Sequence, residues 1–139
     1  HAFAAHGEGF CVFSDIAVAA NVCLEEHGEW LQRVLIIDLD VHQGNGNAVL
    51  FEKDPRVFTF SMQCRENLFS TEQYSDKDVY VSEGTGDKDY LAGTGYILFS
   101  VILSLMSTNI LDSVSTVGLT HARDQFTGCS TGRTSSAHS

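Results

Sequence analysis

The tripeptide Asp40-Val41-His42 has the residue types and the spacing to bind a metal ion. In an extended segment, residues i and i+2 point the same way, so a carboxylate oxygen and an imidazole nitrogen can converge on one cation. This donor pair suits Zn²⁺, although Mn²⁺ or Fe²⁺ would also accept it. A catalytic zinc site needs three protein ligands and an open position, so two residues do not complete one. On its own, an Asp-x-His tripeptide more often belongs to a solvated loop.

Two neighbouring features strengthen the hypothesis of a metal site. Asp38 ends a buried apolar run, where its carboxylate needs a partner. It could orient a catalytic histidine, hold a second cation, or cap backbone amides of the loop. The turn Gly44-Asn45-Gly46 follows. Because no lysine comes after these glycines, they predict a turn that passes close to the site rather than a phosphate-binding loop.

The elements expected to position these residues alternate between helix and strand. Residues 34–37 are a continuous apolar run, mostly β-branched, which predicts a strand buried on both faces of a parallel sheet. Apolar spacing and capping residues predict a helix over about 15–27, a short helix over 47–52 and a second strand over 57–62. This order is typical of an α/β fold, in which ligands bind at the carboxyl ends of the strands.

The remaining segments carry weaker patterns. Residues 65–95 are polar and rich in turn residues, and we assign no helix or strand to them. Residues 97–106 form an apolar run that is too short to span a bilayer and reads as a core segment. Residues 112–139 are rich in Ser and Thr, with little apolar periodicity, and predict a flexible or poorly packed tail.

Composition limits the function classes. The 139 residues carry 18 acidic and 8 basic side chains, a formal charge of −10, which argues against nucleic-acid binding and would suit a basic partner such as a histone tail. The four cysteines form no Cys-x-x-Cys pair, which indicates a reduced, intracellular protein. No apolar stretch is long enough to predict a membrane span.

In combination, the motifs resemble the histone deacetylase family in order and spacing. The matching segments are His1-Ala2, Gly9-Phe10-Cys11, Asp15, the long run from Val34 through Asp38-Leu39-Asp40-Val41-His42-Gln43-Gly44-Asn45-Gly46, and Thr59-Phe60-Ser61. The residues His42-Gln43-Gly44-Asn45-Gly46 of the long motif resemble the class IV branch and its plant and bacterial relatives more than the nuclear class I enzymes. The resemblance implies a truncated arginase/deacetylase-like α/β fold, with a parallel sheet flanked by helices. It covers residues 1–96, a partial catalytic domain, and leaves 97–139 as a divergent and poorly ordered tail.

The resemblance also implies roles at the catalytic centre. Asp40 and His42 match two of the three zinc ligands of the family. His1 matches the second histidine of a His-His pair that exchanges protons with the attacking water and the leaving lysine amine. Asp38 matches the carboxylate that supports the first histidine of that pair, and together with Ser61 it matches a structural K⁺ site.

Three further residues match the channel that receives the acyl-lysine chain. Gly9 and Phe10 correspond to one side of its lining, and Phe69 corresponds to the opposing aromatic wall. From the residues alone, Phe10 could equally be an ordinary core aromatic. The implied substrates are acetyl-lysine proteins such as histone tails, and the implied reaction is zinc-assisted amide hydrolysis.

The sequence also departs from the family pattern. The first histidine of the pair would precede residue 1, and Asn45 stands where many members have an aspartate facing the second histidine. We find no match for the third zinc ligand, nor for the tyrosine that stabilises the oxyanion. We therefore expect a truncated chain that is inactive by itself.

Two alternatives remain open beside the protein deacetylase. One is a related metal amidohydrolase that acts on acetylpolyamines or resembles arginase. The other is a non-catalytic, truncated isoform, which the absent third ligand favours. The sequence does not decide between a nuclear and a cytoplasmic location.

Overall fold

The computed structural model describes residues 1–107 and 114–119 of the chain. The helices and strands of these residues follow in this order: helix α1 (Asp15–Glu26), strand β1 (Arg33–Asp38), helix α2 (Asn45–Phe51), strand β2 (Val57–Cys64), a short 3₁₀ turn (Arg65–Asn67), strand β3 (Lys77–Val81), helix α3 (Asp87–Ser107) and strand β4 (Val114–Leu119).

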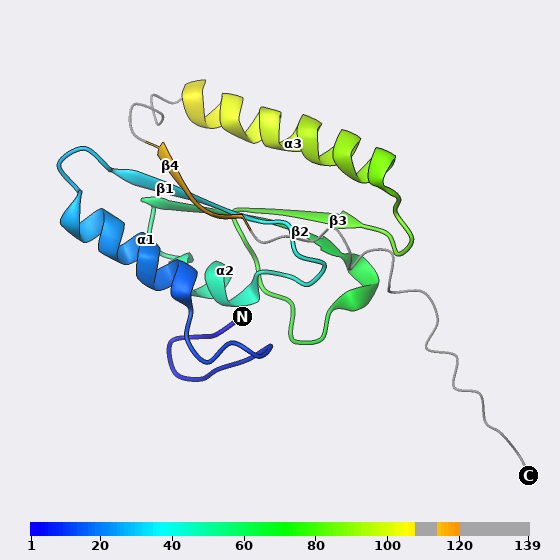
Figure 1. The fold of residues 1–139 in the computed structure, drawn as a ribbon, viewed down its shortest axis with the longest axis horizontal. Helices are drawn as coiled ribbons and strands as arrows, with labels where there is room; N and C mark the ends of the chain where they lie inside the picture. The colour runs from blue at the N-terminus through cyan, green and yellow to red at the C-terminus, as the bar shows by residue number, and fades with distance from the viewer. Residues whose placement is uncertain (108–113, 120–139) are drawn as a thin grey trace, which may run out of the picture.

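The four strands form one parallel sheet in the order β3-β2-β1-β4 (Figure 1). Strand β1 pairs with β2 in a register that runs from Val34 opposite Val57 to Asp38 opposite Ser61. Asp38, the last residue of β1, therefore lies beside Ser61 of β2, and β2 continues to Cys64. The loop that follows β1 starts at the carboxyl edge of the sheet.

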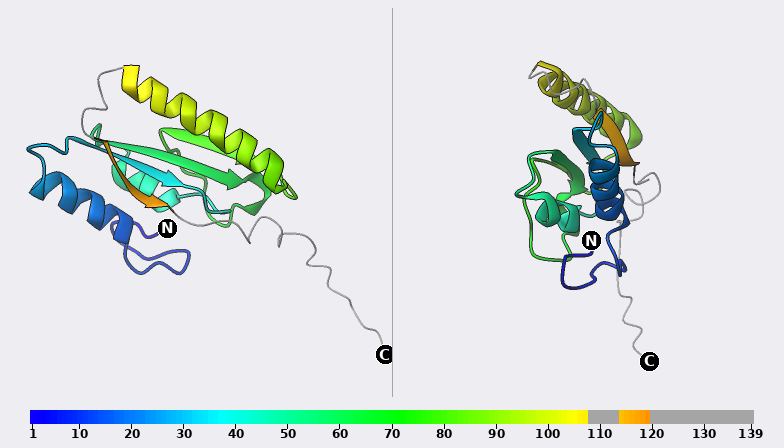
Figure 2. Two further views of the ribbon diagram at one scale, coloured as in Figure 1. Left: turned by 45° about the horizontal axis from the view of Figure 1, so that its top comes forward. Right: turned by 90° about the vertical axis from the view of Figure 1, so that its left-hand side faces the viewer.

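Side chains of β1 alternate between the two faces of the sheet. Val34 and Ile36 pack with α1 and α2 in one apolar cluster, whereas Leu35 and Ile37 pack with α3 in another. The views agree that α1 and α2 cover one face and α3 covers the opposite one (Figures 1 and 2). The predicted α/β fold and the strand buried on both faces are therefore confirmed.

Helix α1 forms where its capping residue and apolar spacing predicted it. The Ser14 hydroxyl accepts a hydrogen bond from the amide of Ala17 at 3.4 Å, and the helix ends beside His27. Ala17, Ala20 and Leu24 are the buried residues of this helix and face the sheet. The face expected from the sequence was Ile16, Ala19, Ala20, Cys23 and Leu24. Ala20 and Leu24 are buried and Ile16 and Cys23 partly so, whereas buried Ala17 was not expected.

The polar segment over residues 65–95, to which the sequence assigned no helix or strand, contains both. Strand β3 lies inside this segment, and α3 begins at Asp87. Carboxylates at Asp87 and Asp89 lie in the first turn of α3, where they favour a helix start because of the helix dipole. Strand β3 lies at the edge of the sheet and is only half buried. Its sequence is therefore partly polar and does not show the continuous apolar run of a buried strand.

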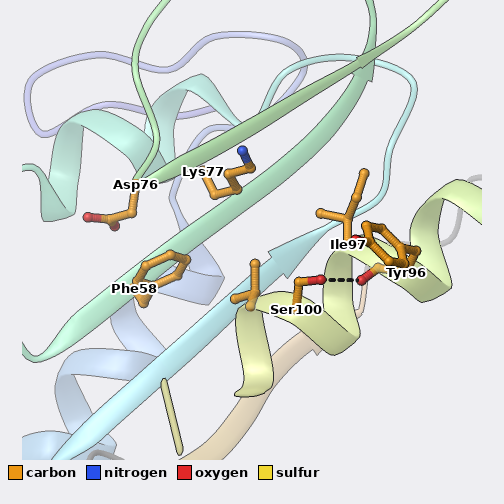
Figure 3. A pocket seen from close by; sticks show the side chains of 7 residues that line it. Phe58, Asp76, Lys77, Tyr96, Ile97 and Ser100 are labelled. Atoms are coloured by element: carbon orange, nitrogen blue, oxygen red, sulfur yellow. Dashed lines mark hydrogen bonds between the residues drawn. The ribbon is translucent and has the colours of Figure 1, made fainter. Parts of the chain in front are cut away.

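Helix α3 packs on the sheet along one stripe and leaves a hollow of about 380 Å³ at the sheet edge (Figure 3). Tyr90, Ile97 and Val101 contact the apolar cluster of Leu35 and its neighbours. The hollow lies between β2, the start of β3 and α3, and its lining comprises Phe58, Asp76, Lys77, Tyr96, Ile97, Ser100 and Val101. The expected core segment over 97–106 is thus part of a helix covering one face.

The expectation of a poorly packed tail falls mainly outside the described residues. Within it, the backbone of Val114–Leu119 forms strand β4, which pairs in parallel with β1. Serine and threonine in these residues do not prevent a strand at a sheet edge. Among the helices that the structure describes, none has the length and apolar character needed to cross a membrane.

Candidate functional site

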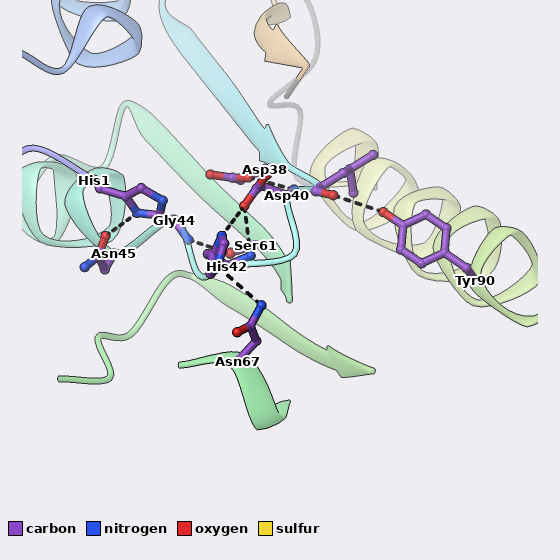
Figure 4. Close-up of polar contacts among 10 residues, drawn as sticks. His1, Asp38, Asp40, His42, Gly44, Asn45, Ser61, Asn67 and Tyr90 are labelled. Atoms are coloured by element: carbon purple, nitrogen blue, oxygen red, sulfur yellow. Dashed lines mark hydrogen bonds and ion pairs between the residues drawn. The ribbon is translucent and has the colours of Figure 1, made fainter. Parts of the chain in front are cut away.

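The loop after β1 takes its shape from two successive carboxylates. Asp38 Oδ1 accepts a hydrogen bond from the Asp40 amide at 3.0 Å, and Asp40 Oδ1 accepts one from the His42 amide at 2.9 Å (Figure 4). Aspartate side chains that bond the backbone two residues ahead create tight local turns. Each acidic residue thus fixes the position of the next site residue.

Asp40 and His42 lie close enough to share one metal ion. Asp40 Oδ1 and His42 Nδ1 are 3.0 Å apart, and a candidate ligand atom of His1 completes a cluster whose atoms lie within 4.8 Å of one another. Two ligands of one tetrahedral Zn²⁺ lie about 3.4 Å apart, given bonds of about 2.1 Å. The two ligand atoms would therefore need to move apart by only about 0.4 Å to bind one zinc ion. One carboxylate oxygen and imidazole nitrogens are donors that zinc accepts.

The two glycines of the turn allow this close approach. A Cβ at Gly44 would lie 2.6 Å from Asp38 Oδ2, and a Cβ at Gly46 would lie 2.5 Å from the carbonyl oxygen of Ala2. Any side chain at either position would collide with the site. The close backbone approach expected here is observed, but Asn45 and Gly46 form the first turn of α2 rather than a loop turn.

His1 is held between a helix and a loop. Its Nδ1 lies 2.8 Å from Asn45 Oδ1 at the start of α2. The backbone of Gly9 lies against the imidazole, so a Cβ at Gly9 would be 2.5 Å from a ring carbon. The structure thus brings His1, Gly9 and Asn45 together.

Phe69 forms an aromatic wall against both histidines. Its ring meets His1 edge to face at 4.9 Å and His42 at 5.3 Å between centroids. Phe10, by contrast, is fully exposed at a turn tip, with a positive φ of 65°. Of the two aromatic residues expected to line a channel, the structure brings Phe69 to the site and leaves Phe10 in solvent.

Asp38 and Ser61 are neighbours at the sheet edge. Asp38 is 8% exposed, and the Ser61 hydroxyl accepts a hydrogen bond from the Gly44 amide at 3.0 Å. The structure thus brings together the residues expected at a K⁺ site. Their observed contacts join the end of β1, the middle of β2 and the residue that caps α2.

Sequence reasoning missed a tyrosine that supports the loop. Tyr90 of α3 donates a hydrogen bond to the carbonyl oxygen of Leu39 at 3.2 Å. Burial raises the pKa of Tyr90, and the charges of Asp38 and Asp40 raise it further, while a hydrogen bond with Thr94 opposes them. The hydroxyl therefore keeps its proton as a donor. Nothing local in the sequence signals this contact across the sheet.

Three polar residues of the site were also missed. Asn67 Nδ2 lies 3.3 Å from His42 Nε2, on the side of the ring away from Asp40. Gln43 exchanges two hydrogen bonds with the backbone of Gln73, at 2.6 and 2.9 Å, and so anchors the loop that follows Phe69. Glu8 accepts a hydrogen bond from Asn45 Nδ2 at 2.7 Å. Gln43 lies inside the long motif and Glu8 directly precedes Gly9, and these positions were their only sequence signal.

A parallel sheet that carries carboxylate and imidazole donors at its carboxyl edge is typical of a metal-dependent α/β enzyme. The family model described as the histone deacetylase domain matches residues 1–104. The chain therefore belongs to the histone deacetylase family, whose members are generally zinc-dependent and include amidohydrolases. The match extends slightly beyond the expected boundary at residue 96.

Individual relatives agree with this assignment. An uncharacterised protein of Picosynechococcus sp. is 50% identical over 91 residues, which cover 66% of this chain and 30% of that protein. Polyamine deacetylase HDAC10 of Rattus norvegicus is 36% identical over 114 residues, which cover 70% of this chain and 19% of that protein. The crystal structure of the HDA15 HD domain matches with a TM-score of 0.60 at 30% identity, covering 85% of this chain and 36% of that one. The chain thus spans less than a third of the length of the Picosynechococcus protein and of rat HDAC10.

Proposed function

We propose that a longer protein containing this segment hydrolyses the amide bond of acyl-lysine side chains, with Zn²⁺ held in part by Asp40 and His42. The observation that carries this proposal is the cluster of His1, Asp40 and His42 at the carboxyl edge of the sheet. Membership of the histone deacetylase family supports it. Acetyl-lysine proteins, including histone tails, are the proposed substrates, since a chain with a formal charge of −10 suits basic partners.

When bound, Zn²⁺ would supply Lewis acidity and lower the pKa of water. The chain's own residues would do the rest. His1, whose ring is fixed by Asn45, would take a proton from the attacking water and give one to the leaving amine. Phe69 would pack against the aliphatic part of the acyl-lysine, and the open backbone at Gly9 would let that chain approach His1.

We also propose that Asp38 and Ser61 belong to a structural K⁺ site, with Asp38 supporting the catalytic loop at the same time. The support is their shared position at the sheet edge and the bonds that each makes to the loop. A cation there would balance the two carboxylates of Asp38 and Asp40, which lie in consecutive turns.

We propose further that the 139-residue chain has no detectable activity by itself. Its sequence offers no match for the third zinc ligand or for the oxyanion-stabilising tyrosine of the family, and losing one oxyanion donor alone costs about 10²–10³ in rate. We infer a reducing, intracellular location from the cysteine pattern, in either the nucleus or the cytoplasm.

One second candidate is the hydrolysis of acetylpolyamines. A relative that is 36% identical over 114 residues is named polyamine deacetylase HDAC10. Both substrates present an acylated amine on an aliphatic chain, so the catalytic residues would serve either one. The difference would lie at the entrance, where a protein tail or a small cation must be admitted.

Hydrolysis assays with two substrates test the proposal. The 139-residue chain, and a longer protein that contains this segment with a third carboxylate ligand and a tyrosine, are given acetyl-lysine peptides and acetylspermidine, with and without a chelator. We expect no turnover by the 139-residue chain and chelator-sensitive peptide hydrolysis by the longer protein, lost in His42→Ala. Turnover of acetylspermidine alone would favour the second candidate. A dead longer protein, or turnover that resists the chelator, would contradict the assignment.

A further inference from the structure

Asn45 is a buried amide whose two ends face different partners. It is 2% exposed, its Nδ2 lies 2.7 Å from Glu8 Oε1, and its Oδ1 lies 2.8 Å from His1 Nδ1. The amide of Gly46 also donates to Oδ1, at 2.9 Å. A carboxamide can rotate by half a turn and exchange these ends, so something must fix its direction.

Glu8 supplies that direction together with the Gly46 amide, because an ionised carboxylate only accepts hydrogen bonds and a backbone amide only donates them. Rotation of the amide would place Asn45 Oδ1 against the carboxylate, where two acceptors repel each other. The hydrogen bond from the Ser70 side chain is the largest influence on the pKa of Glu8 and lowers it; burial opposes this, and Asn45 and His6 lower it further. Glu8 therefore stays ionised, and Asn45 keeps its oxygen towards His1.

The direction of Asn45 in turn fixes the proton of His1. Asn45 Oδ1 accepts only, so the neutral imidazole must carry its proton on Nδ1 in order to make the 2.8 Å contact. Its Nε2 then bears a lone pair. We propose that Glu8 is a positioning residue that, acting through Asn45, holds His1 in the tautomer with the proton on Nδ1.

The backbone around Glu8 is built to hold this carboxylate still. Glu8 and Cys11 exchange two backbone hydrogen bonds, at 3.1 and 2.8 Å, across a two-residue turn. Both turn residues, Gly9 and Phe10, have positive φ, which is the conformation of a type I′ turn. A turn closed in this way leaves Glu8 little freedom apart from its side-chain angles.

This inference deepens the proposed function and rests on it, because the lone pair on His1 Nε2 matters only if His1 transfers protons. A carboxylate in place of Asn45 would accept at both oxygens and would need no partner to set its direction. Glu8 is thus required only as long as residue 45 is an amide. This dependence separates a positioning role from a purely structural one.

Nitrogen NMR of the full chain labelled with ¹⁵N-histidine tests the proposal at alkaline pH, where the rings are neutral. The His1 signals are identified by their absence in His1→Gln. We expect the wild type to show the tautomer with the proton on Nδ1. Glu8→Gln should show a mixture, because a glutamine amide can both donate and accept and so no longer sets the direction of Asn45. Glu8→Ala should show a mixture of both tautomers, and Glu26→Ala, an exposed control on α1, should match the wild type.

The double variant Glu8→Ala/Asn45→Asp should restore the single tautomer. If Glu8→Ala alone does not fold, the tautomer of His1 in the double variant still tests the proposal. A wild-type His1 with the proton on Nε2, a folded Glu8→Ala with an unchanged spectrum, or a double variant that stays mixed would each overturn the proposal. The readout needs neither zinc nor turnover, so a failed hydrolysis assay and a failed tautomer experiment are separate results.

Discussion

The two sides of the sheet are held by different forces. On the site side, the loop from Asp38 to α2 is fixed by hydrogen bonds between side chains and backbone. Two of them join residues two apart in sequence, and a third joins Gly44 to Ser61, the β2 residue paired with Asp38. On the other side, α3 is attached mainly by one apolar stripe that includes Ile97 and Val101. Its remaining surface exposes Leu91 and other large apolar side chains, namely Tyr96, Phe99, Ile102 and Leu103.

This difference indicates how each side responds to change. In the loop, a displaced atom breaks several short polar contacts and moves a candidate metal ligand. On α3, a hollow of about 380 Å³ and an exposed outer surface leave room for altered side chains. We therefore expect function and stability to depend strongly on the loop and on the core of the sheet, and weakly on the outer surface of α3.

The largest effect should come from removing Asp40. With two matched ligands the chain should bind Zn²⁺ weakly, and Asp40→Ala should weaken binding by more than about 100-fold, because losing a ligand exceeds the 10–100-fold cost of disturbing its supporting groups. Calorimetric titration measures this. Asp89→Ala, an exposed carboxylate in the first turn of α3, is the matched control and should bind as the wild type does. Tight one-to-one binding that survives Asp40→Ala would place the metal elsewhere.

A change in the core should produce the next largest effect. Ile36 of β1 is 1% exposed and packs among residues of α1 and α2, so Ile36→Ala should lower the free energy of unfolding by about 2–5 kcal/mol. Leu91 of α3 is 66% exposed, and Leu91→Ala should change it by less than about 0.5 kcal/mol. Urea denaturation compares the two. Equal losses in the free energy of unfolding for the two variants would mean that Leu91 is buried in solution by a contact on the outer surface of α3.

The same division decides how much could be predicted from the sequence. The site loop was readable because its chemistry is local: Asp40 and His42 are two residues apart, and glycine at 44 and 46 marks a close backbone approach. The strand of residues 34–37 was readable because burial on both faces leaves a continuous apolar run. Helix α1 was readable from a cap and a periodic apolar face.

The missed features depend on contacts that are distant in sequence. Tyr90 reaches Leu39 across the sheet, and Glu8 reaches Asn45 from another loop, so neither contact leaves a pattern along the chain. Helix α3 begins among Gly, Thr and Asp residues that are typical of turns, and its burial is limited to one stripe. Propensity alone cannot find an element whose stability comes from packing on a sheet.

A glycine in the loop should be intolerant of a methyl group. Gly44→Ala would place a Cβ 2.6 Å from Asp38 Oδ2, beside a carboxylate that is nearly buried and bonded to the Asp40 amide. Relief requires Asp38 or the loop to move, at a cost of about 1–3 kcal/mol in stability. Thermal or urea unfolding should show the loss, and zinc titration should show weaker binding. An unchanged zinc affinity would mean that the loop and the metal ligands move independently.

The smallest effect should have the opposite sign and should come from α3. Gly93 lies inside this helix, and a Cβ built there meets nothing within 4 Å. Alanine restricts the unfolded chain and favours the helix, so Gly93→Ala should raise the free energy of unfolding by about 0.5–1 kcal/mol. Gly84 also has open space but has a φ of +78°, so Gly84→Ala should lower stability by about 1 kcal/mol. Urea titrations of both variants separate space from backbone conformation. If Gly93→Ala lowered stability, α3 would not be a continuous helix through residue 93.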